Sequence, residues 1–163
     1  MRVLLAGGSG LIGSALARLL CAEGHTVARL VRRKPESEEE FGWDIVRGEI
    51  DEAALDGVDA VVHLGGSNIA EGRWTERRKA ELRASRMGST ALLVNALQHA
   101  HSRPEVFVCA SAVGIYGNRG DEVLTEDSAL GSGFLAELGQ AWEAAAAAAP
   151  TQVIRSEEHT SEL

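Results

Sequence analysis

Short apolar runs alternate with longer stretches in which apolar residues recur at helical spacing. The runs predict strands at residues 2–6, 27–31, 43–47, 60–64, 106–110 and 152–154. The stretches between them predict helices at 11–23, 51–55, 74–101 and 134–149, with polar loops at 32–40 and 111–133. The expected apolar face of the first helix is formed by Ile12, Ala15, Leu16, Leu19 and Leu20.

Strands that alternate with helices indicate right-handed crossovers and a parallel sheet covered on both faces. The predicted fold is therefore α/β, a Rossmann-type doubly wound parallel sheet with strand order 3-2-1-4-5-6. Ligands of such sheets bind at the carboxyl ends of the strands. We expect this domain to span residues 1–154. Residues 155–163 do not continue the pattern and are similar to the translation of a sequencing-adapter oligonucleotide, so we expect a non-native tail there.

Three glycines follow the first apolar run and open the first helix. Gly7 permits a tight turn off the strand, and Gly10 lets a pyrophosphate approach the backbone. Gly13 lets the helix pack close to the strand. A helix N-terminus at this point offers free N–H groups to a phosphate. The candidate cofactor-binding residues of the turn are Gly7, Ser9, Gly10, Leu11, Ile12 and Gly13.

Two other glycine-rich sites fit this segment less well. A P-loop requires lysine after its last glycine, where this chain has Ser14. A nucleophile elbow requires glycine two residues on either side of its serine, but Leu11 follows Ser9 at that distance. The G-x-x-G-x-x-G spacing therefore favours dinucleotide binding over nucleoside triphosphate hydrolysis or ester hydrolysis.

The residues after the second predicted strand indicate which dinucleotide is bound. NAD sites usually place Asp or Glu there, roughly 20 residues past the glycines, to bind the ribose 2′-OH. This chain has Arg32, Arg33 and Lys34 there, and the first acid after the strand is Glu36. Because arginine suits a 2′-phosphate, the sequence predicts NADP rather than NAD, with Arg32 as the phosphate ligand. Arg33 and Lys34 fit a solvated basic loop equally well.

Composition narrows the class of protein. The chain has 163 residues, suited to one domain, and 45% of them are hydrophobic. It has no run of roughly 18 apolar residues and no signal peptide, so we expect a cytoplasmic protein without a membrane span. Cys21 and Cys109 are expected to be reduced core residues. A net charge of −8 argues against a nucleic-acid partner. The five histidines do not gather at metal-ligand spacing, and His63 is expected to be packed at a strand end.

The glycine turn is followed by His-Leu-Gly-Gly at 63–66 and Ser-Ala-Val-Gly-Ile-Tyr-Gly at 111–117. Together these motifs resemble the extended short-chain dehydrogenase/reductase family. Finer matches at 67–69, 72–74, 85–86, 120–122, 125–127 and 142–143 resemble its atypical branch of epimerase-family proteins. The resemblance runs from residue 1 to about residue 154. It implies that the chain is truncated before a C-terminal part that binds most of the substrate.

The resemblance also implies roles for individual residues. It places Ser111 where the family holds its substrate, and it places a further group of residues beside the cofactor. That group consists of Leu64, Gly65, Glu81, Arg86 and Glu143. On sequence alone, Glu81 and Arg86 are equally consistent with an exposed helical surface.

The chain departs from the family at its proton-transfer residues. Typical members use Tyr-x-x-x-Lys, in which tyrosine exchanges the proton and lysine lowers the pKa of that tyrosine. The matching helix, from Phe134, holds neither residue, and the last lysine is Lys79. Tyr116, the only tyrosine, lies near Ser111 and is the candidate substitute; packing against the cofactor site is its other possible role. The resemblance thus implies an NADP-dependent oxidoreductase or epimerase with a small-molecule substrate, and the departure leaves open a non-catalytic NADP(H)-binding or sensing module.

Overall fold

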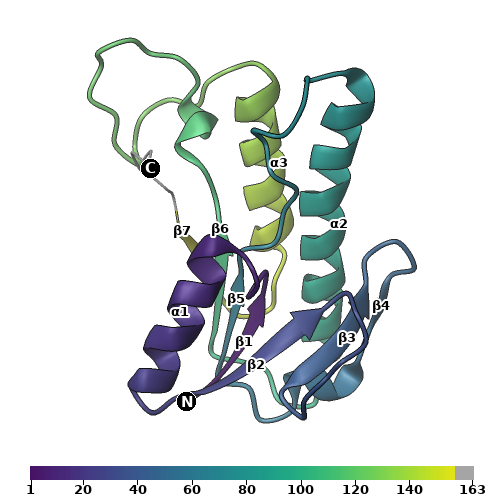
Figure 1. Ribbon diagram of the computed structural model, residues 1–163. Coiled ribbons are helices and arrows are strands. Elements are labelled where there is room, and N and C mark those ends of the chain that lie inside the picture. Colours follow the sequence, from purple (N-terminus) through teal and green to yellow (C-terminus); the bar gives the residue numbers. More distant parts are fainter. Residues whose placement is uncertain (157–163) are drawn as a thin grey trace.

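A computed structural model describes residues 1–156 (Figure 1). Its strands are β1 (Arg2–Ala6), β2 (Thr26–Val31), β3 (Glu40–Asp44), β4 (Glu49–Ile50), β5 (Ala60–His63), β6 (Val106–Ala110) and β7 (Gln152–Ser156). Its helices are α1 (Leu11–Ala22), α2 (Glu76–His99) and α3 (Phe134–Ala147), with short 3₁₀ turns η1 (Glu52–Leu55) and η2 (Val113–Tyr116). No helix within residues 1–156 is both long and apolar enough to cross a membrane.

The strands form one sheet in the order β4-β3-β2-β1-β5-β6-β7. Every neighbouring pair is parallel except β3 and β4. The parallel strands reproduce the predicted order 3-2-1-4-5-6, which confirms the Rossmann-type sheet. The carboxyl ends of these strands therefore meet at one edge, and α2 and α3 extend beyond that edge (Figure 1).

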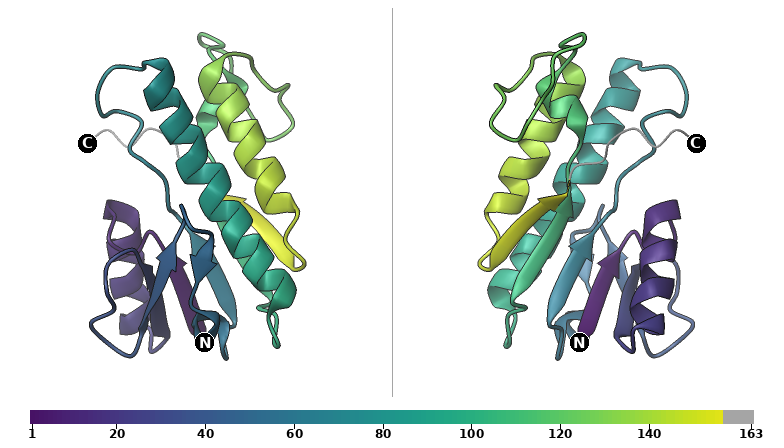
Figure 2. Two further views of the ribbon diagram at one scale, coloured as in Figure 1. Left: turned by 90° about the vertical axis from the view of Figure 1, so that its right-hand side faces the viewer. Right: turned by 90° about the vertical axis from the view of Figure 1, so that its left-hand side faces the viewer.

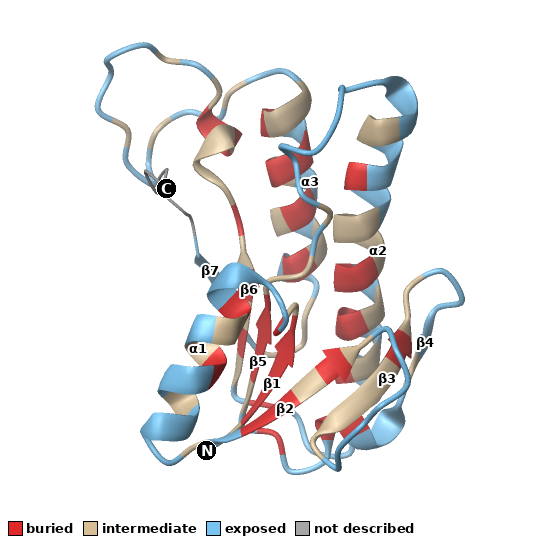
Figure 3. Ribbon diagram, viewed as in Figure 1, coloured by how far each residue is buried: buried red, intermediate tan, exposed pale blue. Residues whose placement is uncertain are grey.

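The period-2 alternation of β1 divides the core between the two faces of the sheet. Val3 and Leu5 pack toward Ala17 of α1. Leu4 and Ala6 belong to the larger cluster formed with α2 and α3. Figure 2 shows α1 on one face and α2 and α3 on the other, and the central strands are buried between them (Figure 3). Because both faces are covered, the central strands are continuous apolar runs.

The predicted apolar face of α1 is partly wrong. The residues that pack toward the sheet are Gly13, Leu16, Ala17 and Leu20. The predicted face residues that are instead exposed are Ile12, Ala15 and Leu19. The reason is the close approach of the helix at Gly13, which rotates the 13-16-17-20 stripe toward β1. Cys21 is likewise exposed, contrary to expectation, whereas Cys109 is buried.

The bounds of β3 and β7 differ from the prediction by two residues or more. The third strand begins three residues earlier than expected, since residues 40–42 pair with β2. Asp44 then accepts hydrogen bonds from the backbone N–H groups of Val46 and Arg47, which turns the chain into the unpredicted antiparallel strand β4. At the other end, β7 continues through Ser156, two residues into the expected tail. The division at residue 154 stays a prediction, and residues 157–163 lie outside the described part.

Replacing Gly13 with alanine should destabilise the fold. A Cβ atom there would meet the carbonyl oxygen of Gly7 and lie 2.8 Å from the Cα atom of Gly8. Overpacking against backbone should lower the free energy of unfolding by roughly 1–3 kcal/mol, although alanine favours helix. Urea denaturation measures this. The matched control is Gly42→Ala in β3, where a Cβ atom meets nothing within 4 Å. Equal stability of the two variants would contradict the prediction.

Candidate functional site

The glycine turn joins three backbone segments at the carboxyl edge of the sheet. Gly7 has a φ of 90°, and the N–H of Gly10 donates to the carbonyl oxygen of Gly7 over 3.1 Å. A Cβ atom on Gly7 would lie 2.8 Å from the carbonyl carbon of Leu64, at the end of β5. The first residue before α1 is Gly10, so no side chain caps the helix. The initial N–H groups of α1 are therefore available to an anion.

A cleft of about 790 Å³ lies beside this turn. The predicted site residues that the structure brings together along it are Gly7, Ser9, Gly10, Arg32, Leu64, Gly65 and Glu81. The exposed side chains of Leu11 and Ile12 begin α1 outside the cleft lining, so these two residues offer only backbone groups. Gly13 packs against the turn itself.

Two adjacent arginines at the end of β2 have different environments. Arg33 donates from Nη1 to Glu40 Oε2 over 2.9 Å and from Nη2 to Glu40 Oε1 over 2.7 Å. These hydrogen bonds lower the pKa of the Glu40 carboxyl. Arg32 lines both the cleft and an adjoining hollow of about 440 Å³ that reaches Trp43 and Ile50. Across residues 1–156, no carboxylate pairs with Arg32, so its charge is available to a ligand.

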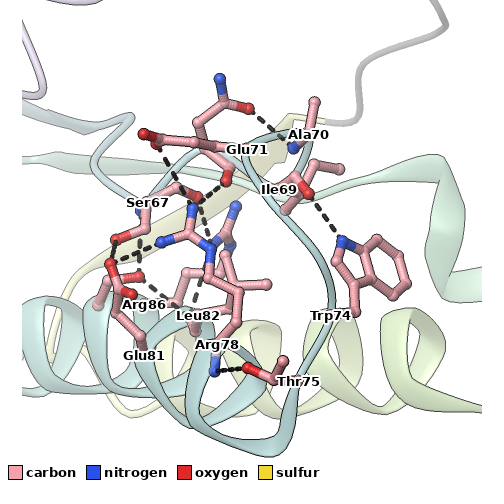
Figure 4. Close-up of polar contacts among 12 residues, drawn as sticks. Ser67, Ile69, Ala70, Glu71, Trp74, Thr75, Arg78, Glu81, Leu82 and Arg86 are labelled. Carbon is pink, nitrogen blue, oxygen red and sulfur yellow. Dashed lines mark hydrogen bonds and ion pairs between the residues drawn. The ribbon is translucent and has the colours of Figure 1, made fainter.

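The loop that precedes α2 forms another part of the cleft wall, through residues 64–68 and Glu71. Figure 4 shows the polar contacts of this loop with α2. Arg78 attaches this loop to the helix, since it donates to the backbone oxygen of Asn68 and pairs with Glu71 at 3.7 Å. It also pairs with Glu81 at 2.7 Å, and this contact lowers the pKa of the Glu81 carboxyl. Sequence reasoning missed Arg78. Its place three residues before Glu81, on the same helical face, was the available signal.

His63 is buried at the end of β5, as expected. Its Nδ1 accepts from the Gly65 N–H over 3.3 Å, so Nε2 carries the proton toward Ser89 Oγ at 3.0 Å and Thr90 Oγ1 at 3.1 Å. Burial, and then the charge of Arg86, lowers the pKa of His63 to about 4. His63 therefore holds the backbone of the cleft wall rather than presenting a titrating group to a ligand.

Arg86 also supports the loop that precedes α2. Its Nη1 donates to the backbone oxygen of Ser67 over 3.1 Å. Its guanidinium lies 5.0 Å from the ring centre of Trp142 on α3 and packs against Gly66. Burial lowers the pKa of this arginine. Arg86 is absent from the cleft lining, so a direct cofactor contact stays a prediction.

The candidate catalytic residues lie around the carboxyl end of β6. Ser111 is buried, and its Oγ donates to Glu143 Oε1 over 2.5 Å. Glu143 also lies 3.6 Å from Arg155 of β7. Tyr116 is buried at the end of η2, where the backbone of Gly131 packs against it. Ser111, Tyr116 and Glu143 do not line the cleft, so their expected roles stay predictions. In the described part of the chain, no group of three or more His, Cys, Asp or Glu residues is placed to hold a metal ion.

The sheet order, the glycine turn and the cleft beside it define a nucleotide-binding domain of the Rossmann type. Residues 3–137 match the NAD dependent epimerase/dehydratase family, and the chain belongs to this family.

Individual relatives agree with this assignment. The chain is 48% identical over 143 residues to the epimerase family protein ML0860 of Mycobacterium leprae, which covers 88% of this chain and 46% of that protein. The structure of the human epimerase family protein SDR39U1 with NADPH superimposes with a TM-score of 0.78 at 36% identity, covering 95% of this chain and 53% of that one. The structure of MoeE5 with UDP-glucose and NAD gives a TM-score of 0.76 at 25% identity, covering 96% and 53%. The chain thus spans about half the length of these proteins.

The buried His63 should make stability depend on pH. Between pH 4 and pH 6.5 the unfolded chain binds a proton at His63 that the native protein does not, so stability rises with pH across this window. Between pH 7 and pH 4 the free energy of unfolding should fall by about 3 kcal/mol more in the wild type than in His63→Gln. Chemical denaturation at a series of pH values measures this. The exposed His101→Gln control should behave as the wild type; a His63→Gln profile parallel to wild type would refute the assignment.

Proposed function

We propose that this chain is the NADP-binding half of an oxidoreductase or epimerase-like protein of the extended short-chain dehydrogenase/reductase type. The observation that carries the proposal is Arg32, which has no carboxylate partner among residues 1–156 and lines a cleft that begins at the glycine turn. An arginine suits a 2′-phosphate because its planar guanidinium donates two hydrogen bonds to phosphate oxygens. The structure of human SDR39U1 with NADPH supports this choice. The structure of MoeE5 contains NAD, so the shared fold alone does not decide between the two dinucleotides, and the choice of NADP depends on Arg32.

The residues of the cleft fit a dinucleotide phosphate. Residues 7–10 and the uncapped start of α1 would hold the pyrophosphate, where the glycines keep the backbone free of side chains. Arg32 would hold the 2′-phosphate at the end of β2. Glu81 and Ser85 of α2 line the far wall. When bound, the nicotinamide supplies or accepts hydride, and the chain's own residues bind and orient it beside a small-molecule substrate.

A second function, a non-catalytic NADP(H)-binding or sensing module, is favoured by a separate observation. No tyrosine or lysine stands in α3, and the hydroxyl of Ser111 is already donated to Glu143. Tyr116 is buried outside the cleft lining. A protein built this way binds the dinucleotide without the usual proton relay. The cytoplasmic location stays an expectation from the sequence.

The cofactor assignment is tested by binding. The 163-residue chain should bind NADPH at least about tenfold more tightly than NADH, because only NADPH supplies a dianion for Arg32. In Arg32→Ala the Kd for NADPH should rise to near that for NADH, measured by isothermal titration calorimetry. Arg103→Ala is the matched control, an exposed arginine that does not line the cleft. An unchanged NADPH preference in Arg32→Ala would show the assignment to be wrong.

Turnover separates the two candidate functions. The measurement uses a full-length protein, in which this chain is followed by a C-terminal half like that of its relatives. Steady NADPH consumption with a carbonyl or sugar-nucleotide substrate, abolished by Tyr116→Phe, is the expected result for the enzyme. Tight NADPH binding without consumption would instead establish the sensing module. Melting curves of Tyr116→Phe confirm that loss of turnover is not loss of folding, since Tyr116 is buried.

A further inference from the structure

Arg29 lies within β2, three residues before Arg32, and its side chain also lines the cleft. Its hydrocarbon stem packs over the glycine turn, because a Cβ atom on Gly8 would lie 3.4 Å from Arg29 Cδ and 3.5 Å from Cγ. The backbone of the residue pairs with Leu5 of β1 on one side and Glu40 of β3 on the other. Rigid elements therefore hold the backbone and the aliphatic stem of the half-buried Arg29 beside the glycine turn.

The carboxylate nearest to Arg29 in the sheet is already engaged. Both oxygens of Glu40 accept hydrogen bonds from Arg33, and Oε2 also accepts from the backbone N–H of Glu36 over 2.9 Å. Glu39 contributes only its backbone oxygen, which accepts from the Arg29 N–H over 2.8 Å. In the part of the chain that the structure describes, the Arg29 side chain makes no hydrogen bond or ion pair. Its charge acts on the Glu40 carboxyl and helps to lower the pKa of that group, but its guanidinium donors are left for a ligand. Guanidinium donors on the cleft lining fit an anionic ligand.

The location of Arg29 identifies which anion. The pyrophosphate is provided for by Gly10 and the N–H groups of α1. Arg29 instead belongs to the strand whose end distinguishes NADP from NAD, and it shares the cleft with Arg32. We infer that Arg29 is a second specificity-determining residue, which binds the 2′-phosphate of NADP together with Arg32. This inference rests on the proposed function of the cleft.

The test compares Arg29→Met with the wild-type chain, because methionine keeps an unbranched stem over Gly8 and removes the charge. The Kd for NADPH should rise about tenfold, and the Kd for NADH should change less than about twofold. The same contrast is expected between 2′,5′-ADP and 5′-AMP, which lack the nicotinamide. Arg29→Lys should retain part of the NADPH affinity. Arg18→Met on the exposed face of α1 is the matched control, with the same change in net charge away from the cleft lining.

Each outcome decides the inference. Equal weakening of NADPH and NADH would overturn it, since Arg29 would then contact a part that both dinucleotides share. Unchanged NADPH affinity would overturn it as well. If Arg29→Met does not fold, Arg29→Gln and Arg29→Lys give the same comparison, and unaltered NADH binding confirms their folding. If the wild-type chain does not prefer NADPH over NADH, the proposed function is wrong. If Arg32→Ala loses the preference for NADPH but Arg29→Met keeps it, only the inference about Arg29 is wrong.

Discussion

The cleft exists because three backbone segments approach one another more closely than side chains allow. At Gly13, α1 lies against the carbonyl of Gly7, and Gly7 in turn lies against the end of β5 at Leu64. Side chains at either glycine would push the helix from β1 or the turn from β5. The floor of the cleft is therefore made of backbone, which offers N–H groups instead of bulk. The rest of the site, including the stem of Arg29 over Gly8, is placed relative to this contact.

The part of the cleft wall that is formed by the loop before α2 depends on a buried polar network rather than on glycine. His63 links the backbone of Gly65 to Ser89 and Thr90 of α2. Thr90 Oγ1 also accepts from Trp142 Nε1 of α3 over 3.0 Å. Because buried polar groups are costly when unpaired, each partner restrains the next. Both helices on this face of the sheet are thereby tied to the loop that lines the cleft, so packing at α3 bears on the position of that loop.

The strands were predictable because their apolar runs are buried on both faces, and β1 and β6 have the predicted bounds. The apolar face of α1 was not predictable, because the contact at Gly13 rotates the helix. The periodicity of the sequence holds no information on that contact. β4 is too short to give a pattern.

The same limit applies to the candidate site. The glycine turn and Arg32 follow from local spacing, and both line the cleft. The sequence favours Arg32 over Arg33 by position alone, and the physical difference between them lies in Glu40, which β3 brings beside β2. Arg29 escaped notice for a related reason. Within a strand a single arginine looks like a surface residue, and only the fold shows that the glycine turn lies over it.

The residues proposed for dinucleotide binding and those proposed for proton transfer lie in different parts of the chain. The groups proposed to hold the dinucleotide line the cleft from the first turn, β2 and α2, whereas Ser111 and Glu143 lie at the end of β6 and on α3. A hydroxyl has one proton, and that of Ser111 is donated to Glu143. While this bond is in place, Ser111 can accept a hydrogen bond from a substrate hydroxyl but cannot donate one to a substrate carbonyl. Carbonyl reduction at this position therefore requires Glu143 to take up a proton or the Ser111 hydroxyl to rotate away, a requirement that dinucleotide binding does not share.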